Sequence, residues 1–281
     1  MSVLINLRDH KKLPEAENQV RTYILKHPKE VLSMSIHELA KKTYTSPASI
    51  IRLCKRLDIK GFSQLKIKLS SEIKTFDNLH LEILDTTTLR KEDTPEVIID
   101  KITNIELESI EETRMLLDTK KMKEAVQMIY DCGTLDLYGV GASNIVALDA
   151  LYKFMRVGKT VSCYQLQDRQ YVQAKSSDST HLAIIFSYSG ETKAMVDIAK
   201  ILQENGVSII SVTSTASSTL SRLADINIHI STRETVFRSG AMASRVSSLY
   251  IVDMLYALYC GKDYDHASEM IERTRIDSKH N

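Results

Sequence analysis

The sequence predicts a two-part fold: an α-helical domain followed by an α/β domain with a doubly wound, parallel, five-stranded sheet. Residues 1–75 show apolar side chains at helical spacing and no strand pattern. From residue 134 onward, short β-branched strands alternate with helices, which is typical of a parallel sheet covered on both faces. The length of 281 residues also suits two domains of ordinary size.

The helices of the first domain follow from their end signals. One helix opens at Pro14 and closes at Pro28. A capping box at residues 35–38 starts the next, because Ser and Glu three positions apart can satisfy each other's backbone N–H groups. After a short break, an N-cap serine and a proline at 46–47 start a helix that runs to Leu57.

Charge is unevenly distributed along the chain. Residues 1–80 contain 15 Lys and Arg against 8 Asp and Glu, a net charge of +7, whereas the other 201 residues carry −6. A basic end on an acidic body indicates a polyanionic partner for the N-terminal part, although chance clustering on solvated faces would give the same count.

Two helices joined by a short turn, the second carrying outward basic residues, are typical of a helix-turn-helix, which we place at about residues 37–56. The second helix would enter the major groove of DNA, where Arg can bind guanine bidentately and Ser can bind several base edges. The candidate DNA-binding residues are Ser46, Ser49, Arg52, Lys55, Arg56 and Lys60, the last three suited to phosphates. A helical bundle with a solvated basic face is the alternative interpretation.

The second domain is built from five strands with helices between them. The expected strands are Leu135–Tyr138, Thr160–Tyr164, Leu182–Phe186, Val207–Val212 and Asp225–Ile230. The expected helices end near Arg156 and Glu204, and a long helix from Met242 to Tyr259 closes the domain.

Two hydroxyl-rich loops follow strands and open helices, GVGAS at 139–143 and SYSGET at 187–192. Ligands of open α/β sheets bind outside the carboxyl ends of the strands, where helix N-termini offer free N–H groups to anions. The candidate ligand residues are Ser143, Ser187, Ser189 and Thr192 as donors, with Gly190 allowing close approach of the backbone. Neither loop matches the Rossmann or P-loop pattern, and ordinary caps and turns remain the alternative.

Enzymatic chemistry has few candidates. General acid–base catalysis needs a proton acceptor, and the sequence offers Glu191, Glu234 and the histidines for that role. We expect His181 and His229, at strand positions, to be core or sheet-edge residues, and we assign no catalytic residue. The four cysteines lie far apart without CxxC pairing, so we expect no disulfide framework and no metal site. We also assign no cofactor.

The segment from Leu13 to Leu69 resembles the N-terminal domain of RpiR-type transcriptional regulators. It contains MSIHELA, the recognition-helix pattern xxRxCxxL as IIRLCKRL, and KGFSQLK in the family's order. One departure is Asp58, where the family usually has glycine. Because Asp tolerates the left-handed conformation better than most residues, we expect the turn to survive with some strain.

The segment from Val126 to Tyr264 resembles the sugar isomerase (SIS) domain, a phosphosugar-binding fold. SxSGxT is its most specific element and occurs here at 187–192, and the Gly-x-Gly-x-Ser loop ends at Ser143. The resemblance also places Glu234, after the fifth strand, near the sugar.

The sequence therefore predicts four segments: a helix-turn-helix domain at 1–77, a linker with connecting helices at 78–125, a SIS domain at 126–266 and a tail at 267–281. The resemblance implies a DNA-binding repressor of sugar or amino-sugar catabolism, controlled by a sugar phosphate and acting on double-stranded operator DNA. We expect a homodimer or homotetramer in the cytoplasm without membrane association, because a single recognition helix gains affinity from two half-sites. A sugar-phosphate isomerase with a helical extension, or a sensor acting through protein partners, is the alternative.

Overall fold

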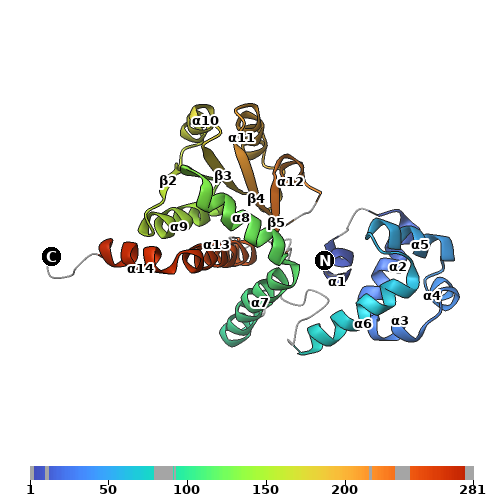
Figure 1. The fold of residues 1–281 in the computed structure, drawn as a ribbon. Helices are drawn as coiled ribbons and strands as arrows, with labels where there is room; N and C mark the ends of the chain where they lie inside the picture. The colour runs from blue at the N-terminus through green and yellow to red at the C-terminus, as the bar shows by residue number, and fades with distance from the viewer. Residues whose placement is uncertain are drawn as a thin grey trace. The chain divides into compact units, whose positions relative to one another are not determined.

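The computed structural model describes residues 3–9, 13–78, 91, 93–214, 217–231 and 241–275. The chain divides into two compact units, Met1–Leu116 and Leu117–Asn281, and each is described by itself. Figure 1 labels the helices and strands of both units.

The described part of the N-terminal unit is entirely helical. Its helices are α1 (Val3–Asp9), α2 (Glu15–Lys26), α3 (Pro28–Ser33), α4 (Ile36–Lys42), α5 (Pro47–Arg56), α6 (Phe62–Asn78) and α7 (Pro95–Leu116). Apolar residues at helical spacing converge on one core, in which Val20, Leu39, Ile50, Leu53 and Leu65 are fully buried. The helical prediction for this half of the chain is thereby confirmed.

The helix-turn-helix is formed by α4 and α5, and both helices are capped as the sequence predicts. The Ser35 N–H donates to Glu38 Oε2 at 2.7 Å, and the Glu38 N–H donates back to Ser35 Oγ at 3.2 Å. Ser46 caps α5, with Pro47 in the first turn. The connecting turn contains Tyr44 at φ 52°, and the chain leaves α5 through Asp58 at φ 56°.

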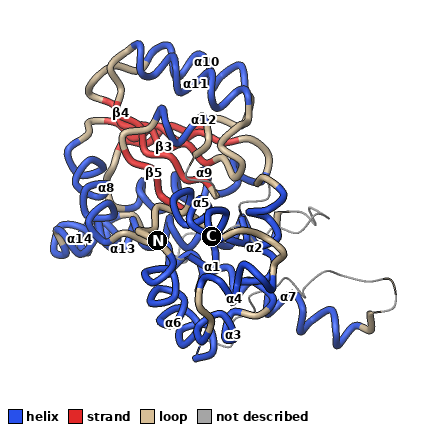
Figure 2. The backbone as a smooth tube through the Cα atoms, turned by 90° about the vertical axis from the view of Figure 1, so that its right-hand side faces the viewer, coloured by secondary structure: helices blue, strands red, loops and turns tan. Residues whose placement is uncertain are grey.

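The C-terminal unit is a doubly wound α/β domain. Its strands are β1 (Thr134–Gly139), β2 (Thr160–Cys163), β3 (His181–Phe186), β4 (Ser208–Thr213) and β5 (Ile226–His229). They form a parallel sheet in the order β2-β1-β3-β4-β5. This order and the helices on both faces of the sheet (Figures 1 and 2) confirm the predicted fold class.

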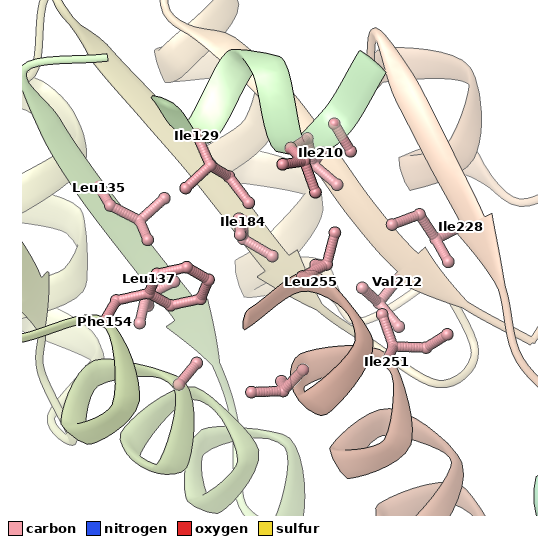
Figure 3. Packing of buried hydrophobic residues seen from close by; sticks show 14 of the residues in the cluster. Ile129, Leu135, Leu137, Phe154, Ile184, Ile210, Val212, Ile228, Ile251 and Leu255 are labelled. Atoms are coloured by element: carbon pink, nitrogen blue, oxygen red, sulfur yellow. The ribbon is translucent and has the colours of Figure 1, made fainter. Parts of the chain in front are cut away.

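Two layers of helices cover the sheet. The first core contains residues of α8 (Thr119–Asp131), α9 (Ala142–Arg156), α13 (Met242–Lys262) and α14 (Tyr264–Arg273). The second contains residues of α10 (Gln167–Ser176), α11 (Lys193–Glu204) and α12 (Thr219–Leu223). Ile184 and Ile185 belong to different cores, because successive side chains of a strand point to opposite faces. Figure 3 shows the first core, where Phe154, Ile251 and Leu255 lie against strand residues.

Several segments differ from the sequence expectation. Helix α8, which the expected boundary between residues 125 and 126 would divide, packs against α13 and β5 and belongs wholly to the second unit. Residues 267–273, expected as tail, continue helix α14, because Asp263 caps it and Ala267 is buried in the first core. Helices α1, α3, α10 and α14 were not predicted. Residues 79–90 of the expected linker and 276–281 of the expected tail lie outside the described residues.

Candidate functional site

Helix α5 has one buried and one exposed face. The residues of its buried face are Ile50, Leu53 and Cys54. Arg52 and Lys55 are exposed on the opposite side, as predicted, and Lys60 is exposed just beyond the helix. This outer face carries the charge that a polyanion would contact.

The two serines at the start of α5 are bound within the protein. Ser46 Oγ accepts a hydrogen bond from the Ser49 N–H at 3.3 Å, and the Ser49 hydroxyl accepts one from Arg52 Nη2 at 2.9 Å. Ser49 is 3% exposed, so the expectation that it lies on the outer face is wrong. The reason is geometric: position 49 precedes the buried Leu53 by four residues and therefore shares its face.

Glu17 on α2 is a buried carboxylate held by two arginines of α5. Its side chain is 2% exposed, with Oε2 2.5 Å from Arg56 Nε and Oε1 3.5 Å from Arg52 Nε. A buried carboxylate requires such pairing, because its desolvation is otherwise costly. The pair between Glu17 and Arg56 joins residues 39 apart in the chain, so no local pattern indicated it.

The second unit contains a cavity of about 150 Å³ at the carboxyl ends of the strands. Three segments line it: the β1–α9 loop, the β3–α11 loop and the first turns of α13. Its lining residues are Val140, Ala142, Ser143, Val146, Tyr188, Ser189, Thr192, Ala241, Ser244, Arg245 and Ser248. Three of the predicted ligand residues, Ser143, Ser189 and Thr192, therefore lie together on one cavity.

The β1–α9 loop is shaped by two glycines. A Cβ on Gly139 would lie 2.7 Å from the backbone carbonyl of Ser143, so the strand can meet the helix this closely only without a side chain. Gly141 precedes α9 at φ 59° and ψ −125°, a conformation that side chains disfavour. No side chain caps α9; within its first turn the Ser143 N–H donates to the Val140 carbonyl at 3.2 Å and the Asn144 N–H to the Gly141 carbonyl at 3.0 Å.

The β3–α11 loop places Ser187 behind the cavity rather than on its wall. Ser187 is 3% exposed, and its hydroxyl donates to Thr192 Oγ1 at 3.2 Å. It thereby orients the threonine that does line the cavity. Thr192 precedes α11, which also has no side-chain N-cap.

The structure requires glycine at position 190 for a different reason from the one that the sequence predicts. Its φ is +64°, and a Cβ there would lie 2.1 Å from Ser218 Oγ and 2.4 Å from Ser218 Cβ. The glycine is required by packing between this loop and the start of α12. It does not line the cavity, so close approach to a ligand is not what the structure shows for it.

Arg245 lines the cavity, and sequence reasoning missed it together with the neighbouring Ser244 and Ser248. It lies on the first turn of α13, between Ser244 and Ser248, which also line the cavity. Its guanidinium has no carboxylate partner among the described residues. The available signal was compositional, since Arg and three Ser occur together in the first two turns of an otherwise apolar helix. With Ser143, Ser189 and Thr192, Arg245 makes this cavity suited to a small anion.

The candidate bases are otherwise engaged. The Glu191 carboxylate accepts the Thr219 N–H at 2.7 Å, and that bond lowers the pKa of Glu191 below its ordinary value. Burial lowers the pKa of His229 to about 4. No carboxylate or imidazole lines the cavity within the part of the chain that the structure describes, and Glu234 lies outside it.

His181 belongs to a separate polar cluster around Asp136, near the other end of the sheet. Asp136 is 1% exposed and accepts hydrogen bonds from Ser177 Oγ at 2.6 Å and Gln173 Nε2 at 3.0 Å. His181 Nδ1 lies 2.8 Å from the same carboxylate. These partners satisfy a buried charge, which supports the expected structural role for His181.

Metal sites and membrane spans are both absent from the described residues. No group of three or more His, Cys, Asp or Glu side chains there could hold a metal ion. No helix among those residues is long and apolar enough to cross a membrane.

Comparison with known proteins identifies both units. Residues 1–75 match the helix-turn-helix domain of the rpiR family, and residues 128–258 match the SIS domain. Over 92% of its length, the chain is 35% identical to an HTH-type transcriptional regulator of Caldanaerobacter subterraneus subsp. tengcongensis, of which it covers 90%. The chain belongs to the RpiR family of transcriptional regulators. It is also 28% identical to the HTH-type transcriptional regulator HexR of Pseudomonas aeruginosa, over 95% of this chain and 93% of HexR.

Solved structures agree with this membership. The Vibrio vulnificus NanR protein, complexed with ManNAc-6P, matches this RpiR-family chain with a TM-score of 0.60 and 25% identity, covering 96% of each chain. The sugar isomerase domain of an RpiR transcription factor from Sphaerobacter thermophilus matches 63% of this chain and 97% of its own, with a TM-score of 0.58. At 18% identity the second likeness concerns the fold alone.

Proposed function

We propose that this RpiR-family regulator represses genes of sugar or amino-sugar catabolism and that a sugar phosphate controls its binding to operator DNA. The observation that carries the proposal is the convergence of Ser143, Ser189, Thr192 and Arg245 on one cavity between two uncapped helix N-termini. A phosphate monoester accepts hydrogen bonds from hydroxyls and a guanidinium, and the positive ends of two helices favour its negative charge.

The phosphorylated sugar as effector is supported by a relative. NanR of Vibrio vulnificus, similar over 96% of this chain, was solved with ManNAc-6P. The cavity here has the donors for the phosphate of such a ligand, and Tyr188 and Val140 on its wall offer surface for the sugar ring. We therefore take amino-sugar 6-phosphates as the first compounds to test.

The DNA-binding half of the proposal rests on α5. Arg52 and Lys55 occupy its exposed face, Ser46 fixes its N-terminus, and Glu17 restrains Arg52 from one side. We assign Arg52 to base edges and Lys55, Arg56 and Lys60 to phosphates. Because one recognition helix reads one half-site, the active form is a homodimer or homotetramer on an inverted repeat, acting in the cytoplasm where the operator lies.

We propose no catalytic step for this chain. A sugar isomerase needs a base at the reacting carbon, and Glu191 is tied to α12 while His181 lies in the Asp136 cluster. The hydroxyls and the arginine of the cavity bind an anion without moving a proton. The basic helix-turn-helix would also have no role in an isomerase.

The test is a ligand titration of DNA binding. Full-length protein first selects its duplex sites from a random library, and the affinity for a selected site is followed by fluorescence anisotropy as ManNAc-6P or another hexose 6-phosphate is added. Ser189→Ala combined with Thr192→Val removes two hydroxyls from the cavity. Each hydrogen bond to a charged phosphate contributes about 1.5–3 kcal/mol, so the double variant should need at least about a hundredfold more ligand. Its DNA affinity without ligand should equal that of the wild type.

Two controls give the result its meaning. Ser268→Ala removes an exposed hydroxyl on α14 and should respond like the wild type. Unphosphorylated N-acetylmannosamine should have no effect at the same concentrations. A wild-type response from the double variant, or an equal response to the unphosphorylated sugar, would exclude the cavity as a phosphate site.

A further inference from the structure

The outer face of α5 contains hydrocarbon as well as charge. Ala48 is exposed and Ile51 is half-buried, and the exposed Arg52 and Lys55 follow them along the helix. The four positions are spaced i, i+3, i+4 and i+7, so they form one stripe along the helix. This stripe, Ala48, Ile51, Arg52 and Lys55, lies opposite the buried face of α5.

The polar groups of α5 that could read bases are fewer than the sequence indicates. Ser49 is buried and its hydroxyl accepts from Arg52. Glu17 on α2 binds Arg56 at 2.5 Å and lies 3.5 Å from Arg52 Nε, so both arginines are held at one side while Arg52 stays exposed. The stripe therefore presents two cationic side chains and two apolar ones. An apolar side chain on a surface that enters a groove needs an apolar partner there, because its water is displaced on binding.

The major groove of DNA offers one apolar group, the 5-methyl of thymine. We propose that Ala48 and Ile51 contact thymine methyl groups, so that each half-site is read by hydrocarbon contacts to thymines in addition to the Arg52 contact. This inference rests on the proposed DNA-binding function and adds the base that the apolar residues select.

Helix geometry constrains where those thymines lie. Three residues of helix advance by about 4.5 Å, which compares with about 3.4 Å between stacked base pairs. The methyls contacted by Ala48 and Ile51 therefore lie one or two base pairs apart. Pro47 in the first turn and the small Ala48 beside it let the N-terminus of the helix approach the groove floor closely.

Uracil substitution tests this contact without disturbing base pairing. Selected duplex sites are synthesised with deoxyuridine in place of each thymidine in turn, which removes the 5-methyl alone. Burial of one methyl group corresponds to about a fourfold change in affinity. We expect that loss at one or two positions per half-site for the wild type and for Arg52→Ala. In Ile51→Ala, the site that faces Ile51 should bind uracil and thymine alike.

Matched variants distinguish the loss of a thymine contact from a loss of folded protein. Ile67→Ala removes the same atoms from α6, where Ile67 is 71% exposed, and should keep the full uracil sensitivity. Thermal melting followed by circular dichroism establishes that Ile51→Ala is folded. Ala48→Ser gives a second, independent variant, expected to lose sensitivity at the neighbouring thymine.

The outcomes distinguish this inference from the function on which it rests. If the full-length protein selects no duplex sites, the DNA-binding function itself is wrong. If sites are selected and Arg52→Ala weakens their binding, but uracil is tolerated at every position, the thymine contact is wrong. Selected half-sites without thymine, or uracil sensitivity unchanged in folded Ile51→Ala, would also overturn it.

Discussion

Tyr44 holds a backbone conformation that few tyrosines adopt. It lies in the turn between α4 and α5 at φ 52°, and its side chain is 94% exposed. A residue with a Cβ in this left-handed region costs about 1–2 kcal/mol, and no burial of the ring compensates for it here. Asp58, at φ 56°, has the same backbone problem with a side chain that tolerates it better.

Replacing Tyr44 by glycine should therefore stabilise the protein. Relief of the left-handed strain outweighs the extra chain entropy of glycine in the unfolded state, and we expect a net gain of about 0.5–1 kcal/mol. Urea unfolding followed by circular dichroism measures it. Tyr44→Ala keeps the strain while removing the ring and should show no gain, and Asp58→Gly should gain less. A stability of Tyr44→Gly below the wild type would show that the exposed ring stabilises the fold.

At this scale the sequence predicted which residues occur at the sites better than what each one does. Ser143, Ser189 and Thr192 were found because loops that follow parallel strands meet at one edge of the sheet, where ligands bind. Ser49 and Gly190 were assigned to ligands, yet their positions follow from packing against residues that are distant in the chain. Arg245 was missed because a helix turn gives no sign of the loops it will meet in space.

The β3–α11 loop shows how one element is fixed by another. Gly190 donates its N–H to the Ser187 carbonyl and accepts from the Leu220 N–H at 3.0 Å. The Glu191 carboxylate accepts from the Thr219 N–H. The loop and the start of α12 are thus joined directly behind the residues that line the cavity.

Gly190→Ala should disrupt this junction. The new Cβ would overlap Ser218, because it would lie 2.1 Å from the Ser218 hydroxyl oxygen. The alanine would also have to keep the positive φ of Gly190, which residues with a side chain disfavour. Overlap of this kind costs about 1–3 kcal/mol beyond the conformational strain. Gly206→Ala is the matched control, because Gly206 has φ +71° and a Cβ added there would meet no atom within 4 Å, so strain alone applies. Thermal melting should rank Gly190→Ala well below Gly206→Ala; equal melting temperatures would show that the loop moves freely away from α12.

Elements with a strong apolar period were predictable, and polar ones were not. The strands have β-branched runs bounded by turns, and α5 has a capped amphipathic pattern. Helix α10 has neither, because its buried side chains include Gln170 and Gln173. Gln170 Nε2 donates to the Gly139 carbonyl at 2.9 Å, so hydrogen bonds replace apolar contacts on its inner face. No periodicity rule detects such a helix from sequence.

For the molecule as a whole, the sequence predicted the division into two domains but not the surface through which copies of the chain assemble. The basic N-terminal unit and the acidic α/β unit were separable by charge and by pattern. The long helix α13, which the sequence predicts at the end of the domain, packs one face against the sheet, where Ile251, Val252 and Leu255 are buried.

Helix α9 instead provides an exposed apolar stripe within the α/β unit. Ile145 is 55% exposed, Tyr152 63% and Met155 54%, and their spacing of seven and three residues places them on one face. Single exposed apolar residues are common on protein surfaces, but several gathered on one face are typical of an interaction site. A twofold arrangement of this stripe would join two chains, and therefore two recognition helices, in one assembly.

We therefore expect wild-type protein to be a dimer or larger at micromolar concentration, and Ile145→Lys with Tyr152→Lys to shift it toward monomer. Two lysines per protomer facing two others across a twofold axis oppose association through like charge and lost apolar burial. Tyr264→Lys, which changes a 72% exposed aromatic on α14, is the matched control and should leave the assembly intact. Multi-angle light scattering measures the masses. A monomeric wild type, with and without duplex DNA, would contradict the oligomer, whereas an unchanged mass for the double lysine variant would show that the interface does not include this face of α9.

The monomeric variant should also bind DNA differently, because two linked half-sites multiply affinity through effective concentration. We expect it to bind a selected inverted repeat at least about a hundredfold more weakly than the wild type, while its affinity for a single half-site stays near that of one recognition helix.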